Sequence, residues 1–147
     1  MPLPERIGSL SNPKILRANI TAFERLLAYN RKAKIIWAHM GWDNTGFRTT
    51  TLSRELLEKH PNLYMSIKTR KRSRPENKPI NDQSEIKPEW LDMIRAFPGR
   101  FLIGSDLKYG LPREGKSGLK VLFSELPPEL ARKVGYKNAE DLFKLSD

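Results

Sequence analysis

Asp106 has a residue type and a position that could support chemistry. It follows the short apolar run Phe101–Ile103, then Gly104 and Ser105. Apolar residues on consecutive positions are typical of a buried parallel strand, and α/β folds bind their ligands where such strands end. A carboxylate at that place is a candidate metal ligand or general base, although Asp residues that follow strands also cap turns.

His39 follows a second apolar run in the same way. The run Ile35–Ala38 precedes it and Gly41 comes two positions later, so the imidazole is expected where a strand leaves the core. A histidine there can ligate a metal ion or hold a water molecule for proton transfer near neutral pH. A single histidine on an apolar strand is more often structural. With Asp106, however, two strands end in groups suited to one metal-bound water, which predicts that both side chains face the same small space.

Two basic residues lie at the end of a third predicted strand, Asn62–Lys68. Lys68 and Arg70 leave the same end of it, where they are candidate contacts for a substrate carboxylate or are simply solvated. His60 lies before Pro61 at a predicted helix end. Capping of that helix explains a histidine there, and no catalytic role is assigned to it.

The basic segment Lys68–Arg74 supplies an alternative function. Its seven residues carry five positive charges, and the formal net charge of the chain is +10. Such a run can neutralise phosphates, as in a small basic module that binds nucleic acid or another polyanion. No zinc-finger spacing or RNA-recognition signature accompanies it, so a solvated loop is the favoured interpretation and nucleic acid is not the expected partner.

Residues 110–117 have the spacing of a phosphate-binding Walker loop. Gly118 directly after them weakens the start of the helix that such a loop requires. The residues beyond Ser117 also contain no apolar strand ending in Asp to hold magnesium. Nucleotide binding is therefore not predicted.

Apolar spacing predicts an alternation of helices and strands along the chain. Helices are expected at about 13–30, 52–60, 88–97 and 119–126, with a last helical region that starts at Pro127 or Pro128 and runs through Leu145. Strands are expected at 34–39, 62–68 and 101–106. This order is that of a parallel α/β fold, and 147 residues suit one domain.

Composition narrows the class of protein further. No apolar run approaches the roughly 20 residues of a membrane span, and no membrane partner is expected. The N-terminus lacks the features of a signal peptide, so a cytoplasmic location is the default expectation. Because the chain has no Cys, His and carboxylate side chains would have to hold any metal ion.

Four segments in order resemble the amidohydrolase superfamily, in particular its amidohydrolase-related metal-dependent hydrolases and decarboxylases. Segment 35–41 is similar to the family's sixth strand with its His-x-Gly ending, 62–66 to the seventh, and 100–106 to the eighth. Segment 126–143 is similar to the terminal segment, in which an Asn-Ala pair precedes the final helix. The resemblance implies a partial (β/α)8 TIM barrel in which residues 1–147 form the last three β/α units, a single incomplete domain.

The resemblance also implies roles for the two candidate residues. Asp106 would bind the metal ion and help to accept a proton from its water, and His39 would ligate the ion or orient that water or the substrate. The implied reaction is hydrolysis or decarboxylation of a small, carboxylate-bearing substrate. Zinc is the expected divalent ion, with manganese and iron as alternatives.

The chain departs from the family pattern in its missing ligands. It has no His-x-His on a first strand and no fifth-strand His, and a barrel of this type takes about 250 residues. We therefore expect the C-terminal portion of an enzyme, with metal binding weak or absent and little activity without a complementary N-terminal half. That half or further copies of the chain are the expected protein partners, and a non-functional remnant is the remaining possibility.

Overall fold

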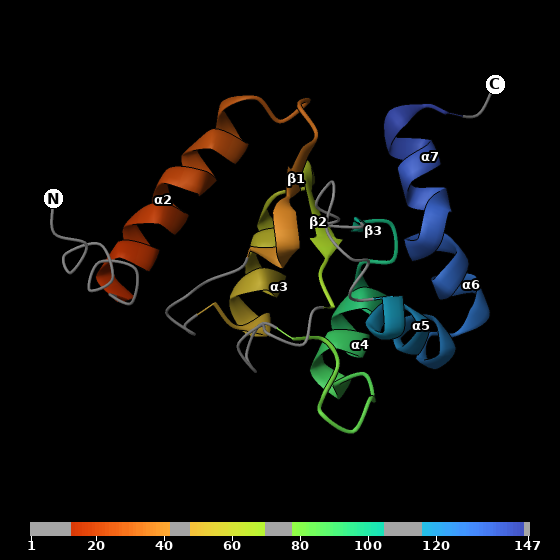
Figure 1. Ribbon diagram of the computed structural model, residues 1–147. Coiled ribbons are helices and arrows are strands. Elements are labelled where there is room, and N and C mark those ends of the chain that lie inside the picture. The colour runs from red at the N-terminus through yellow and green to blue at the C-terminus, as the bar shows by residue number, and fades with distance from the viewer. Residues whose placement is uncertain (1–12, 42–47, 70–77, 105–115, 146–147) are drawn as a thin grey trace, which may run out of the picture.

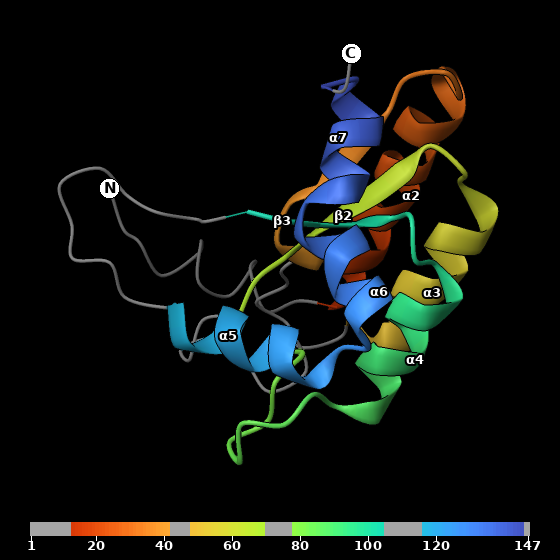
Figure 2. The same cartoon turned by 90° about the vertical axis from the view of Figure 1, so that its right-hand side faces the viewer.

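A computed structural model of the chain describes residues 13–41, 48–69, 78–104 and 116–145. Helices surround a three-stranded parallel sheet (Figures 1 and 2). The strands are β1 Ile35–Trp37, β2 Leu63–Ile67 and β3 Phe101–Ile103. The helical elements are α2 Pro13–Tyr29, η1 Ala38–Met40, α3 Thr50–Lys59, α4 Pro88–Ala96, α5 Lys116–Glu125, α6 Pro128–Arg132, η3 Lys133–Lys137 and α7 Asn138–Phe143. The predicted α/β class is confirmed, and the arrangement is compatible with part of a (β/α)8 barrel.

Helix boundaries follow from apolar spacing and from capping residues. On α2, Ile20, Phe23 and Leu27 recur at intervals of three and four, and all three pack against the core. α3 begins after Thr49, whose side-chain oxygen accepts a hydrogen bond from the backbone N–H of Leu52 at 3.2 Å. Local sequence therefore fixes where these helices start and which face they bury.

The sheet has the order β1-β2-β3, so each strand lies beside the next one in the chain. Trp37 is level with Met65, Met65 is level with Phe101, and Ile67 is level with Ile103. Because all three strands are parallel, they begin at one edge, here called the amino edge, and end at the opposite one, the carboxyl edge. In Figure 1, α2 lies on the β1 side of the sheet and α6 and α7 on the β3 side.

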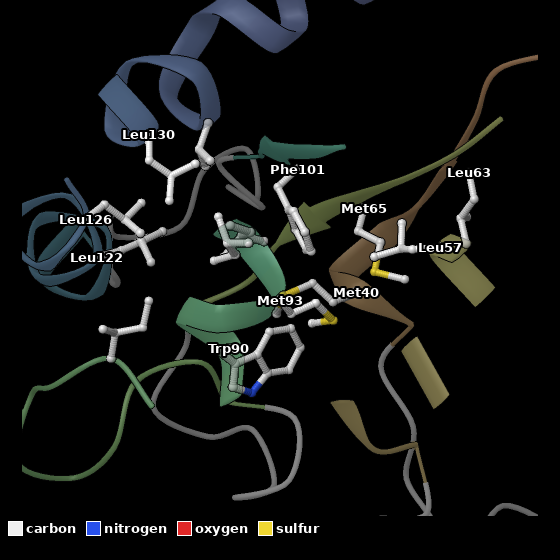
Figure 3. Close-up of a cluster of buried hydrophobic side chains, with 14 of the residues drawn as sticks. Met40, Leu57, Leu63, Met65, Trp90, Met93, Phe101, Leu122, Leu126 and Leu130 are labelled. Atoms are coloured by element: carbon white, nitrogen blue, oxygen red, sulfur yellow. The ribbon is translucent and has the colours of Figure 1, made fainter. Parts of the chain in front are cut away.

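β2 shows how the strand sequence divides the two faces of the sheet. Leu63, Met65 and Ile67 are buried in the core, whereas Tyr64 and Ser66 between them are only partly buried. Side chains alternate along a strand, so Ser66 lies on the face opposite Met65. The core cluster in Figure 3 joins Met65 to Met40, Leu57, Trp90, Met93, Phe101, Leu122 and Leu130.

Asn62 ties the end of α2 to the amino edge. Its side chain is 1% exposed, and its Nδ2 donates to the carbonyls of Leu27 at 3.0 Å, Ala33 at 3.1 Å and Asn30 at 3.3 Å. The last carbonyls of a helix have no partner within the helix, so a buried donor there replaces the water that they would otherwise need.

Two further side chains hold the amino edge together. The Arg100 guanidinium donates to the carbonyls of Leu63 and His60, which joins the start of β3 to the start of β2. Asn138 Nδ2 donates at 2.8 Å to the carbonyls of both Pro98 and Phe101. The asparagine of the terminal Asn-Ala pair thus anchors the last helices to β3.

His60 also lies at the amino edge, and it is buried. Its backbone N–H bonds to the Leu56 carbonyl and closes α3, and its Nε2 lies 3.3 Å from Glu24 Oε1. Glu24 also accepts a hydrogen bond from Lys59. The hydrogen bond from Lys59 first, and that from His60 after it, hold the pKa of Glu24 below its ordinary value, against the opposing effect of burial.

We expect Glu24→Gln to lower stability at pH 7 and to matter progressively less in acid. A carboxylate whose pKa is lowered by folding stabilises the fold above its unfolded pKa, about 4.3 for Glu, and this contribution fades as pH falls through the folded pKa. The difference in free energy of unfolding between the two proteins at pH 7 should be modest, because largely exposed ion pairs contribute about 0 to 1 kcal/mol. Urea melts of both proteins between pH 7 and pH 3 measure it. In a Lys59→Ala background, Glu24→Gln should change the free energy of unfolding by less at every pH. A difference that stays constant as the pH falls would contradict a lowered pKa for Glu24.

Candidate functional site

The carboxyl edge carries two of the four predicted site residues in the part of the chain that the structure describes. His39 follows β1 directly, and Lys68 is the first residue after β2. Asp106 and Arg70 lie outside the described residues, as does most of the basic segment Lys68–Arg74. The structure therefore places His39 and Lys68 at the same edge of the sheet. The pairing of His39 with Asp106 stays a prediction.

Topology nevertheless limits where the chain leading to Asp106 starts. β3 ends at Ile103, level with Ile67 of β2, and the chain leaves the sheet there through Gly104. Neighbouring strands lie about 4.8 Å apart, so β1 and β3, on either side of β2, lie about 10 Å from each other. β3 therefore brings the chain to the same edge as His39.

The prediction that strand β1 extends to His39 is wrong, because β1 ends at Trp37. His39 lies instead in a tight turn, residues 38–41, here called the His39 turn. His39, Met40 and Gly41 have φ angles of 56°, 56° and 67°, so three successive residues adopt left-handed backbone. The Gly41 N–H donates to the Ala38 carbonyl at 3.1 Å and closes the turn. Left-handed conformation costs a residue with a Cβ about 1 to 2 kcal/mol, so the surroundings must hold His39 and Met40 there.

Several contacts hold the His39 turn in place. The His39 backbone N–H donates to Ser66 Oγ of β2 at 3.1 Å. The Met40 side chain is fully buried in the core. The Arg48 Nε–H donates to the Gly41 carbonyl at 3.1 Å. The backbone of the turn is thus fixed on both sides of the imidazole, which leaves the half-buried His39 ring at the carboxyl edge.

Arg48 and Ser66 are the residues of this site that the sequence interpretation missed. Ser66 had a usable signal, since it is a hydroxyl within an otherwise apolar strand. Arg48 had none, because one arginine in a polar loop looks like a solvated side chain. In the structure it is 0% exposed, with its guanidinium 5.3 Å from the centre of the Trp90 ring.

Helix α5 reaches the carboxyl edge at the end of β2. A Cβ on Gly118 would lie 2.7 Å from the Thr69 carbonyl oxygen, so only glycine permits this approach. The predicted start at residue 119 is wrong, because α5 begins at Lys116 and includes Gly118. The cost of glycine in a helix is offset here by close packing, which brings the start of α5 beside Thr69.

The ligands in the described part of the chain are too few for a metal site. No three His, Asp or Glu side chains come together there. Of the two histidines in the sequence, His60 belongs to the amino edge and contacts Glu24. His39 is a ligand type that zinc accepts, but zinc sites use at least three protein ligands.

Comparison with protein families gives one match. A family model described as amidohydrolase matches residues 10–145, which covers the whole described region. Searches of curated proteins and of solved structures found no match. Among the described helices, none combines the length and the apolar character that a membrane crossing needs.

Proposed function

Because this chain belongs to the amidohydrolase family, we propose that its carboxyl edge is part of a hydrolase or decarboxylase active site built on His39 and Asp106. Family membership supports a hydrolase-like function in general. The observation that carries the specific proposal is the convergence of the ends of β1 and β3 on one edge, with His39 held there in a strained turn. Active-site residues of (β/α)8 enzymes lie at this end of the strands.

The proposed roles follow from the chemistry of each group. The imidazole of His39 can accept or donate a proton near neutral pH, and the Asp106 carboxylate can accept one from an attacking water. Amidohydrolases in general use divalent metals, and such an ion supplies a water of lowered pKa and polarises a carbonyl. His39 and Asp106 suit zinc in donor type, and manganese or iron are the alternatives.

Further ligands are proposed to come from a complementary N-terminal half, because two donors are fewer than a catalytic zinc site uses. On this proposal residues 1–147 form one incomplete barrel domain, and the isolated chain has little or no activity.

A small, carboxylate-bearing molecule is the proposed substrate. Lys68 leaves β2 at the carboxyl edge, two residues beyond the Ser66 that bonds to His39. With Arg70 it would provide cationic donors for the substrate carboxylate, at a distance from the reacting bond.

Expression of the chain with the polypeptide encoded directly upstream tests the proposal. The pair should co-purify, and with Zn²⁺ or Mn²⁺ it should release amine from N-acetyl amino acids or CO₂ from small carboxylic acids. His39→Ala and Asp106→Asn should each lower kcat/KM at least about 10²-fold, the size of a general acid-base contribution. Asp141→Asn is the matched control, because Asp141 lies on α7, is 63% exposed and pairs with Lys137.

Two results would contradict the proposal. Turnover by the isolated chain, lost on Asp106→Asn, would refute the need for a second half. A complex whose activity survives both substitutions would refute the site. Salt-sensitive binding of RNA or DNA that disappears when the basic residues of Lys68–Arg74 are neutralised would instead favour the polyanion-binding alternative.

A further inference from the structure

Arg48 is a buried charged residue whose burial calls for an explanation. It precedes the capping residue of α3 and is 0% exposed. Removing a guanidinium from water is costly, so such a side chain is kept only where its hydrogen bonds and packing compensate. Two of its interactions involve described residues, a hydrogen bond to Gly41 and a contact with the Trp90 ring.

The first interaction anchors the His39 turn and the second reaches the core. The bond from Arg48 Nε to the Gly41 carbonyl holds the residue that follows His39 and Met40. The Trp90 indole under the guanidinium is itself fully buried in the core on α4. The turn is thus linked through Arg48 to the rigid interior, and not only to the neighbouring strand.

We propose that Arg48 is a positioning residue, which keeps the imidazole of His39 in one orientation at the carboxyl edge. Its importance for catalysis rests on the proposed function, but its effect on His39 does not. Three successive left-handed residues are a strained arrangement that would relax if its carbonyl anchor were removed.

The chemistry of the anchor requires arginine. A guanidinium is planar, so one face can stack on the Trp90 ring while an edge N–H points at the Gly41 carbonyl. Lysine carries the same charge on a flexible stem and cannot do both in a fixed geometry. If Arg48 only neutralised charge or filled space, Lys or Met at this position would leave His39 unchanged.

The two histidines allow a direct test by nuclear magnetic resonance, because the chain contains only His39 and His60. Their imidazole carbon–proton signals are recorded at fixed pH for the full chain and for Arg48→Lys and Arg48→Met. The His39 signal should move or split into several, while the His60 signal at the amino edge stays in place. His39→Gln and His60→Gln assign the two signals.

Arg100→Met is the matched control. Arg100 also donates to backbone carbonyls and also lies over an aromatic ring, that of Tyr64, but it serves the His60 end of the sheet. It should disturb the His60 signal and spare that of His39. Trp90→Phe is the second variant if neither Arg48 variant folds, since it leaves Arg48 in place and weakens the contact under its guanidinium, at the cost of a small cavity in the core.

The outcomes separate positioning from general stability. An unmoved His39 signal in the folded Arg48 variants, or in Trp90→Phe where those do not fold, overturns the proposal. Equal disturbance of both histidines in the Arg48 variants also overturns it, because that pattern marks a global loss of packing. Failure of the upstream complex to show activity would refute the proposed function and leave this result unaffected.

Discussion

Asn62→Ala is expected to destabilise the protein by about 2 to 4 kcal/mol. The substitution removes the donor that three carbonyls share, those of Leu27, Asn30 and Ala33. A buried group left without its partner costs about 1 to 3 kcal/mol, and the missing side chain adds a small cavity. Domains of this size have only about 5 to 15 kcal/mol of stability in total, so the loss should be plain in urea melts followed by circular dichroism.

Asn19→Ala is the matched control for Asn62→Ala. Asn19 is exposed on α2, where alanine is the better helix former, so the change should be neutral or slightly stabilising. Asn62→Asp sharpens the comparison, because it replaces the donor by a carboxylate oxygen that faces the same carbonyls. A stability change below about 0.5 kcal/mol for Asn62→Ala, the usual range for surface substitutions, would show that water replaces the side chain without cost.

Gly41→Ala is expected to lower stability by about 2 to 4 kcal/mol and to disturb the site as well. The new Cβ would lie 2.3 Å from the Trp37 ring, and its residue would have to keep a φ of 67°. Left-handed backbone costs about 1 to 2 kcal/mol and overpacking about 1 to 3 kcal/mol. The Trp37 ring packs on Phe23 of α2, with ring centres 4.8 Å apart, so it has little freedom to move aside.

Gly99→Ala provides the comparison for Gly41→Ala. A Cβ at Gly99 meets nothing within 4 Å, and its φ lies outside the left-handed region. Its effect should stay near zero, or be stabilising by about 0.4 to 1 kcal/mol through the unfolded chain. Equal urea midpoints for the two variants would mean that the His39 turn relaxes freely, which would also weaken the case for Arg48 as its anchor.

Much of the fold could be predicted because it depends on short-range patterns. Apolar runs located all three strands, and the spacing of Ile20, Phe23 and Leu27 located the buried face of α2. The early start of α5 could not be predicted in this way. It depends on the approach of Gly118 to Thr69, 49 positions earlier in the chain (118 minus 69), which no local pattern encodes.

The site could be predicted only in part. The apolar run before His39 correctly indicated that this residue follows a strand. Because β1 and β2 are parallel, His39 and Lys68 lie at the same edge of the sheet. The left-handed turn was not predicted, because His39 and Met40 carry no signal for positive φ and their conformation is imposed by Ser66, Arg48 and the core. Asp106 and Arg70 remain predictions.

The bond between Asn138 and β3 has a consequence for synthesis of the protein on the ribosome. Its acceptors, the Pro98 and Phe101 carbonyls, lie 40 and 37 residues before their donor. At about 5 to 20 residues per second, β3 is made about 2 to 8 seconds before the side chain that secures it. During that interval the buried Phe101 lacks the helices that cover it, so the nascent chain should pass through a stage at which chaperones can bind it.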